Sequence, residues 1–199
     1  MDKQLRIIAA HGSDDTLLSI RRALGGAHTI TGAFGTVAEL RTAARSDRPD
    51  LIVTGVMFPD GSGIDACIEL GAERPIPAVI VTARRSMELV YKAIRDHVMA
   101  YLIEPVTPED LQASVIVAWA RFEQLRDLQE QVGDLKQALS DRKIIERAKG
   151  VLMAIEEISE GEAFSRIRRA AQDQRTTMKA IAERILAGAV GGMQPRQSS

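Results

Sequence analysis

The 199-residue sequence has a single cysteine and no long apolar run. One cysteine, Cys67, excludes an intramolecular disulfide and is typical of a reducing compartment. No apolar stretch approaches the ~18 residues of a membrane span, and the polar N-terminus lacks the pattern of a secretion signal. Glycine-rich phosphate loops, zinc-ligand spacings and nucleophile triads are also missing. We therefore expect a cytoplasmic protein that is not an enzyme, that holds no metal or cofactor and that has no membrane partner.

Acidic and basic residues nearly balance, and the formal net charge is -1. The balance hides a local excess, because residues 141–199 carry 11 Lys and Arg against 8 Asp and Glu. Within 163–184 the only acidic residues are Asp173 and Glu183, against six cations. A basic face on an otherwise neutral protein indicates an anionic partner for the C-terminal end. A solvated helix face would give the same charge pattern.

Residues 5–105 alternate short apolar runs with helical patterns, as in a series of βα units. The run Leu51–Val53 is apolar at every position, as expected when helices cover both faces of a parallel sheet. We predict a flavodoxin-like, doubly wound, five-stranded parallel sheet within residues 1–107, with a pocket at the carboxyl ends of the strands. The predicted strands are Leu5–Ala10, Thr29–Ala33, Leu51–Thr54, Ala78–Thr82 and Ala100–Ile103, with helices near 15–25, 37–46, 63–71 and 86–96.

After Thr107 the sequence predicts helices alone. Thr107 is a candidate N-cap, and Pro108 suits the first helical position. Apolar residues then recur every three or four positions, which is a heptad seam with one phase slip near Leu125. We expect residues 108–140 to form a long helix that pairs with a second copy of the chain in a coiled-coil homodimer, although the helix could instead fold back onto its own domain. The seam residues are Leu111, Val115, Ala118, Phe122, Leu125, Leu128, Val132, Leu135 and Leu139.

The C-terminal part reads as a compact three-helix unit over residues 141–187. Ser159 and Glu162 have the spacing of a capping box, which predicts a helix through about Gln172. A second cap at Thr176 or Thr177 predicts a helix through Leu186. The end of the long helix supplies the third helix. Residues 188–199 are rich in glycine, glutamine and serine, and we expect a disordered tail there.

The N-terminal part carries familiar features. The loop after the third strand reads Met57-Phe58-Pro59-Asp60-Gly61, the fourth strand ends on Thr82, and the fifth contains Tyr101. With these features residues 4–120 resemble the receiver domain of two-component response regulators. The resemblance implies that Thr82 takes the place of the hydroxyl that contacts the phosphoryl group, and that Tyr101 takes the place of the aromatic switch residue. Glu104-Pro105 stands where the family has Lys-Pro, usually with a cis peptide.

The same resemblance implies that the chemistry of the pocket is missing. The acceptor carboxylate lies four residues before the loop proline in the family, and here that place is Gly55. The places of the acidic pair that holds magnesium are Gly12 and Ser13, and the place of the lysine is Glu104. We therefore expect a pseudo-receiver that forms no acyl phosphate. Its degenerate pocket consists of Gly12, Ser13, Gly55, Thr82, Tyr101 and Glu104.

Three further polar positions near this pocket have structural interpretations. Asp14-Asp15 reads as a negative first turn of the following helix. Asp60 favours turn formation over catalysis. His11 could be a phosphoacceptor or a pH sensor, but the sequence shows no carboxylate paired with it, and we expect a structural role.

Four segments of the C-terminal part share a second resemblance, namely Ile145–Met153, Ile158–Phe164, Arg168–Ala171 and Ile181–Leu186. With these segments residues 140–187 resemble the ANTAR domain, the RNA-binding output module of bacterial transcription antitermination regulators. The resemblance implies binding of paired hairpins in the leader of a nascent transcript, which prevents a terminator from forming. Arginine clusters near an aromatic side chain suit RNA loops. The candidate RNA-binding residues are Lys149, Phe164, Arg168, Arg169, Arg175 and Lys179, of which Phe164 is also a candidate core residue.

Two other classes of function remain open from the sequence. The stretch Phe164–Leu186 could be a DNA-binding helix-turn-helix, although its connector lacks the expected glycine and its second helix carries only Lys179 and Arg184. Alternatively, the chain is an adaptor whose receiver-like domain docks another protein. A ligand-sensing regulatory protein is a possible partner of the pseudo-receiver.

Overall fold

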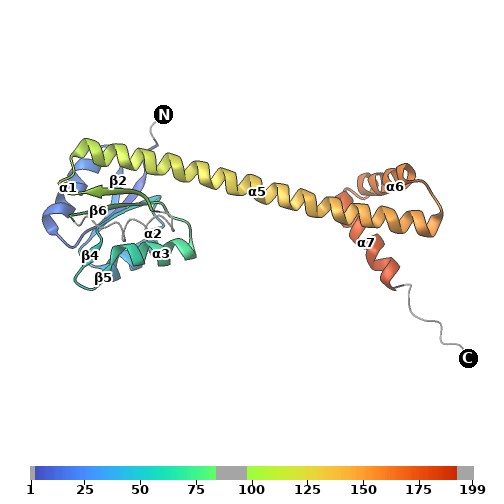
Figure 1. The fold of residues 1–199 in the computed structure, drawn as a ribbon, viewed down its shortest axis with the longest axis horizontal. Coiled ribbons are helices and arrows are strands. Elements are labelled where there is room, and N and C mark those ends of the chain that lie inside the picture. The colour runs from blue at the N-terminus through green and yellow to red at the C-terminus, as the bar shows by residue number, and fades with distance from the viewer. Residues whose placement is uncertain (1–2, 84–97, 192–199) are drawn as a thin grey trace, which may run out of the picture. The chain divides into compact units, whose positions relative to one another are not determined.

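The computed structural model describes residues 3–83 and 98–191, which fall into two compact units, Met1–Asp127 (unit 1) and Leu128–Ser199 (unit 2) (Figure 1). The strands are β1 Arg6–Ala10, β2 Thr29–Phe34, β3 Leu51–Thr54, β4 Met57–Phe58, β5 Gly61–Ser62, β6 Ala78–Thr82 and β7 Val98–Ile103. The helices are α1 Asp14–Leu24, α2 Val37–Asp47, α3 Gly63–Glu73, α5 Pro108–Glu156, α6 Glu160–Asp173 and α7 Met178–Gly191. Among the described residues, no helix is both long enough and apolar enough to cross a bilayer.

Unit 1 contains the predicted five-stranded parallel sheet, in the order β2-β1-β3-β6-β7. The predicted strands are confirmed to within two residues at each end, and α1, α2 and α3 lie where helices were expected. The helix expected near 86–96 lies outside the described residues. The short antiparallel pair β4–β5 was not predicted. It comprises only two residues on each side, which is too short for a periodic pattern to reveal.

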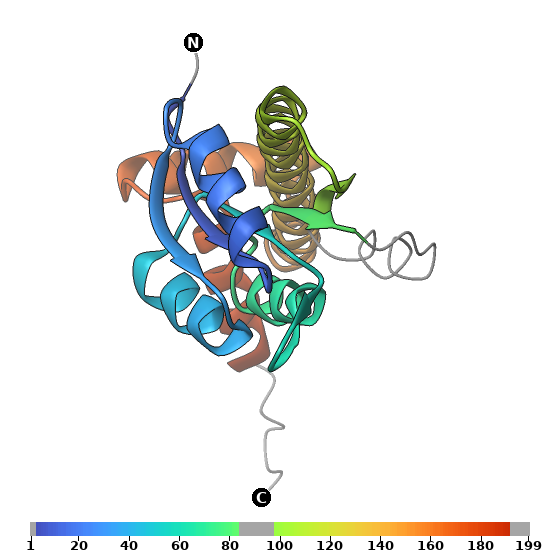
Figure 2. The same cartoon turned by 90° about the vertical axis from the view of Figure 1, so that its left-hand side faces the viewer.

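Two apolar cores lie on opposite faces of this sheet. One core places α1 and the first part of α5 against Ile7, Val53 and Val79, and the other places α2 and α3 against Ile8 and Ile52. Figure 2 shows this arrangement, with α2 and α3 below the strands and α1 and α5 above them. The alternation along β1 and β3 explains why these strands are apolar at every position, since each successive side chain enters a different core.

Helix α5 begins as expected, because the Asp110 backbone N–H donates to Thr107 Oγ1 at 3.1 Å. Its first apolar residues do not fulfil their predicted role. Leu111, Val115, Ala118 and Phe122 were predicted as dimerisation residues, but they are at most 9% exposed, and the first three belong to the core of unit 1. The alternative in which the helix folds back onto its own domain is therefore correct for this part of α5. The sheet face offers an apolar surface that would otherwise remain in water.

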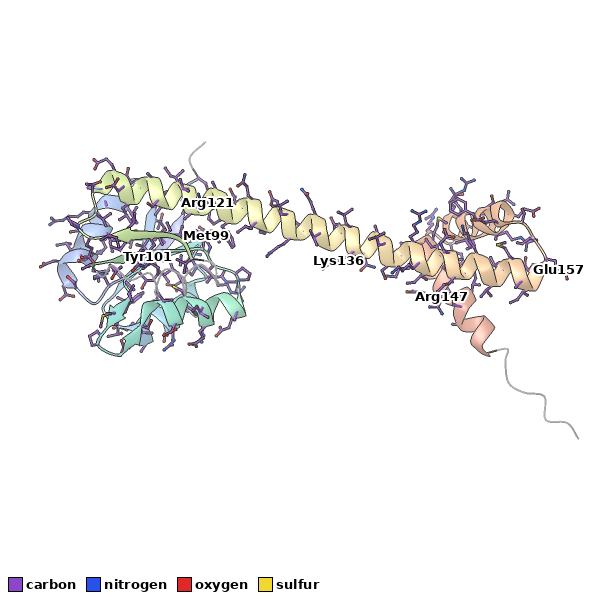
Figure 3. All side chains as sticks on the ribbon, viewed as in Figure 1. Met99, Tyr101, Arg121, Lys136, Arg147 and Glu157 are labelled. Atoms are coloured by element: carbon purple, nitrogen blue, oxygen red, sulfur yellow. The ribbon has the colours of Figure 1, made fainter. Side chains whose placement is uncertain are left out.

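The later seam residues lie in a different environment. Leu125, Leu128, Val132, Leu135 and Leu139 are 47–65% exposed. Every residue from Gln124 to Ser140 is exposed, and Figure 3 shows the side chains around Lys136 projecting from α5. The apolar seam predicted from the heptad spacing is thus present on this part of α5, and no described element covers it.

Unit 2 consists of the end of α5 with α6 and α7. Ala148 and Ile167 are fully buried where these helices meet, with Ala171, Ile181 and Ala182 beside them. The Ser159–Glu162 capping box is present at the start of α6, and Thr177 Oγ1 accepts from the Ala180 N–H at the start of α7. Helix α7 continues to Gly191, so residues 188–191 are helical and not part of a tail. Residues 192–199, where the rest of the tail was predicted, lie outside the described residues.

Candidate functional site

The carboxyl ends of the parallel strands bring the predicted pocket residues of unit 1 together. Gly55 follows β3, and its N–H donates to the Ala10 carbonyl of β1 at 2.8 Å. Glu104 follows β7, and its N–H donates to the Thr82 carbonyl of β6 at 2.9 Å. Gly12, Gly55, Thr82 and Glu104 therefore lie at one edge of the sheet, as expected for the carboxyl ends of a parallel sheet. The peptide bond between Glu104 and Pro105 is cis, as the resemblance implied.

Two of the predicted pocket residues have other roles. Ser13 caps α1, since its Oγ accepts from the Thr16 N–H at 3.4 Å. Tyr101 lies within β7, paired with Ile80, and packs at the edge of a core cluster with Val56 and Ile64.

A histidine and a glutamate form the polar centre of the pocket. His11 directly follows β1 and is 8% exposed. Its Nδ1 accepts from the Ser13 N–H at 3.0 Å, which assigns the ring proton to Nε2. Nε2 lies 3.3 Å from Glu104 Oε1, and the other carboxylate oxygen, Oε2, accepts from Thr16 Oγ1 at 3.0 Å. The sequence analysis missed this pair. The signal was present, because both residues directly follow strands whose ends share one edge of the sheet.

Asp60 has the structural role that the sequence indicated. Its two carboxylate oxygens accept from the backbone N–H groups of Val37 and Ala38 at 2.9 and 3.0 Å. These bonds hold the pKa of Asp60 below its usual value, because they favour the charged form. The carboxylate thus fixes the loop after β3 to the start of α2.

In unit 2 the three predicted RNA-binding arginines are all exposed. Arg168 and Arg169 lie on α6, and Arg175 follows it with φ near 48°. Within the described part of the chain, none of the three forms an ion pair. Arg168 and Arg169 also line a groove of about 660 Å³ along α6, together with Ser159, Gly161, Glu162, Ser165, Arg166 and Gln172. These guanidinium groups are available to an anionic ligand.

Phe164 is 41% exposed, so the structure places it outside the core. It precedes Arg168 by four residues on α6, a spacing that puts the two side chains on one side of the helix. An exposed aromatic ring beside a free guanidinium is an arrangement on which an unpaired base can stack.

The two predicted lysines are used within unit 2. Lys149 is only 7% exposed, and its Nζ lies 2.7 Å from both Glu146 Oε2 and Glu160 Oε1. Hydrogen bonds to these carboxylates, first Glu146 and then Glu160, raise the pKa of Lys149. Lys179 Nζ lies 2.9 Å from Asp141 Oδ1, which joins α7 to α5. Lys149 is therefore not a ligand-binding residue as predicted but a structural one, and Lys179 is already paired.

The comparisons with known proteins agree with both units. The model of the response regulator receiver domain matches residues 7–116, and the model of the ANTAR domain matches residues 133–186. The chain is 38% identical over 80% of its length to the transcriptional regulatory protein PdtaR of Mycobacterium tuberculosis, and it covers 78% of that protein. It therefore belongs to the two-component-type regulators that join a receiver domain to an ANTAR RNA-binding domain. These families are regulatory.

More distant relatives match the receiver part alone. The DNA-binding response regulator MtrA of Mycolicibacterium smegmatis is 30% identical over 53% of the chain and 46% of its own length. The receiver domain of the response regulator NarL from Mycobacterium tuberculosis is 16% identical, with a TM-score of 0.56 over 59% of the chain and 98% of that domain. A CheY-like receiver domain from Methanospirillum hungatei is 21% identical, with a TM-score of 0.57 over 61% of the chain and 98% of that domain. These solved structures support the receiver fold.

The ion pairs of unit 2 predict a loss of stability in acid. The pKa values of Glu160 and Asp141 are lowered from the ordinary 4.5 and 3.8, by Lys149 and Lys179 respectively. A lowered folded-state pKa gives stability that is fully present above the unfolded-state pKa and that is lost as the pH falls from there through the folded-state pKa. We expect the thermal unfolding midpoint, Tm, of the helices to decrease as the pH is lowered from about 5 to about 3. Circular dichroism measures this change. Glu160→Gln should flatten this dependence and Glu130→Gln should not. Equal slopes in both variants would contradict the assignment.

Proposed function

We propose that the chain binds paired RNA hairpins in the leader of a nascent transcript and acts as a transcription antitermination regulator. The observation that carries the proposal is the set of exposed arginines, Arg168, Arg169 and Arg175, which lie in an ANTAR unit and have no carboxylate partner within the described residues. By occupying the hairpins, unit 2 would prevent a competing terminator from forming, so that the downstream genes are transcribed.

The chemistry of this surface suits an RNA loop. RNA is read mainly where bases are unpaired and can be stacked on aromatic or guanidinium planes, while phosphates bind the remaining cations. Phe164 and Arg168 offer such planes side by side on α6, and Arg169 and Arg175 extend the positive charge around them. Duplex DNA keeps its base planes stacked and exposes only base edges and phosphates, so it would offer no plane to Phe164. This difference favours RNA over the helix-turn-helix alternative.

Removal of two arginines tests the RNA-binding surface. Arg168→Ala combined with Arg169→Ala should raise the Kd for a two-hairpin leader RNA by about 30-fold or more, since each arginine contact contributes about 1–3 kcal/mol. Arg21→Ala combined with Arg22→Ala removes the same charge from α1 of unit 1 and should leave the Kd unchanged. Electrophoretic mobility shift at fixed salt measures both. Unchanged retention by the α6 variant would discard the site, and retention of duplex DNA instead of RNA would favour the DNA-binding alternative.

We also propose that the exposed seam Leu125–Leu139 pairs with a second copy of the chain. The seam repeats at spacings of three and four residues, and the positions beside it are mostly neutral, including Gln124, Gln129 and Gln131. Two copies therefore meet no like-charge repulsion along most of the seam. A dimer carries two RNA-binding units, and a target with two hairpins gains affinity when both are bound at once.

A charge placed in the seam tests the dimer. Leu135→Lys buries an ammonium group in the paired form and should convert the protein to a monomer in analytical ultracentrifugation. Ser140→Lys adds the same group outside the seam and should remain dimeric. Affinity for the two-hairpin RNA should fall only in the Leu135 variant, and affinity for a single hairpin should be unchanged in both. A wild-type chain that sediments as a monomer at micromolar concentration would end this part of the proposal.

Unit 1 serves in this scheme as a pseudo-receiver that takes no phosphoryl group. A glycine at position 55 offers no carboxylate, and Glu104 puts a negative charge where a phosphoryl group would need a positive one. Control would then come from protein binding, for example from a ligand-sensing partner that docks on unit 1.

Acetyl phosphate tests the pseudo-receiver. Incubation of the whole chain with acetyl phosphate and Mg²⁺ should add no mass of a phosphoryl group in intact-protein mass spectrometry, because the place of the acceptor carboxylate is taken by Gly55. A conventional receiver domain labelled in parallel is the control. Stoichiometric labelling of this chain would contradict the assignment, and mapping of the modified residue would identify the acceptor.

A further inference from the structure

The glycine at position 55 is explained by its neighbour His11. A β-carbon added to residue 55 would lie 2.6 Å from His11 Cδ2, closer than real β-carbons approach a neighbour, and 3.0 Å from its Nε2, which is also tight. The backbone does not itself require glycine, since Gly61 is the only described glycine with φ in the left-handed range. The imidazole of His11 therefore occupies the space into which any side chain at position 55 would extend.

The ring of His11 is held on both of its nitrogens. Nδ1 accepts from the Ser13 N–H, and Nε2 lies against Glu104, whose other carboxylate oxygen is fixed by Thr16. A free side chain could rotate away from an added methyl group. This one cannot move without breaking the hydrogen bond from Ser13 and the contact with Glu104, at a site that is 8% exposed, where groups left without partners are costly.

The surrounding backbone is equally close. A β-carbon on Gly12 would lie 2.5 Å from the Met57 carbonyl oxygen, and one on Gly63 would lie 2.0 Å from the Gly55 carbonyl oxygen. The loop after β3 thus packs directly over the ends of β1 and β3, with no room for an additional group beside the histidine.

We propose that His11 closes the pocket of unit 1 and that Glu104 is the positioning residue that holds it closed. Loss of the acceptor and loss of the lysine are then two parts of one substitution, in which the His11 imidazole and the Glu104 carboxylate replace an acidic centre and its counter-charge. The pocket admits neither a phosphoryl group nor a side chain to carry one, and a carboxylate restored at position 55 alone would be displaced by the ring. The inference concerns unit 1 and is independent of whether unit 2 binds RNA.

A double-mutant cycle in the full-length chain tests the coupling between positions 11 and 55. Unfolding of unit 1 is followed by the fluorescence of Trp119, the only tryptophan, which packs against its core. Gly55→Ala should lower Tm by about 5 °C in the presence of His11, and by less than half of that in a His11→Ala background. Gly26→Ala, where an added β-carbon meets nothing within 4 Å, is the control and should not lower Tm. Equal losses from Gly55→Ala in both backgrounds would overturn the proposal.

A spectroscopic measurement keeps the test independent of the stability of the variants. In ¹⁵N-labelled wild-type protein the His11 ring should show the neutral tautomer protonated on Nε2. Glu104→Gln retains an oxygen beside Nε2 and should preserve this signature, whereas Glu104→Ala should lose it and should also reduce the cost of Gly55→Ala. A ring protonated on Nδ1, or a Glu104→Ala variant with unchanged signature and unchanged cost, would show that Glu104 does not hold the histidine.

Discussion

The arrangement of apolar residues along α5 is the constraint on which the rest of the molecule depends. The helix must cover the sheet of unit 1 at its beginning and contribute to the core of unit 2 at its end. Up to Phe122 the apolar residues follow spacings of four and three, which keep them on the face toward the sheet. Two consecutive spacings of three, from Phe122 to Leu125 and on to Leu128, each fall about 60° short of a full turn at 3.6 residues per turn, so together they rotate the stripe by roughly 120°. The phase slip therefore marks where the helix stops serving its own domain.

The cations of unit 2 divide into those that pair with carboxylates of neighbouring helices and those that have no carboxylate partner in the part of the chain that the structure describes. A small three-helix unit has little apolar surface to bury, and polar contacts between its helices add to its stability. Lys149 joins α5 to the start of α6, Lys179 joins α5 to α7, and Arg166 pairs with Glu156 at the end of α5. Among the described residues, Arg168, Arg169 and Arg175 have no carboxylate partner, and the same holds for Arg142 and Arg147 on α5 and Arg184 on α7. The charges that hold the unit together are thus distinct from the charges that can meet a ligand.

Features that depend on neighbouring residues could be predicted from the sequence, whereas features that depend on contacts between distant segments could not. Strands, caps and the seam follow local rules, so Leu51–Thr54, Ser159 and Leu128 could be predicted from neighbours a few residues away. The exposure of Lys149 could not be predicted in this way, because it depends on an ion pair with Glu160 in the next helix. The pairing of His11 with Glu104 joins residues from opposite ends of unit 1, and the place of Leu111 depends on which face of α5 the sheet covers. Local pattern gives the elements, whereas burial and ion pairing require the fold.

If the pocket of unit 1 is closed, the signal that controls this regulator has to act through binding. In the proposed dimer, dimerisation and RNA binding would be thermodynamically linked, since a two-hairpin target that prefers the dimer must stabilise the dimer by the same factor. The seam of five apolar residues is short for a coiled coil and would give a dimer of modest stability without RNA. A partner that docks on either unit needs only a small difference in affinity between monomer and dimer to shift this equilibrium. The regulator would then respond to the concentrations of its copies, its partner and its RNA, without any covalent change in the chain.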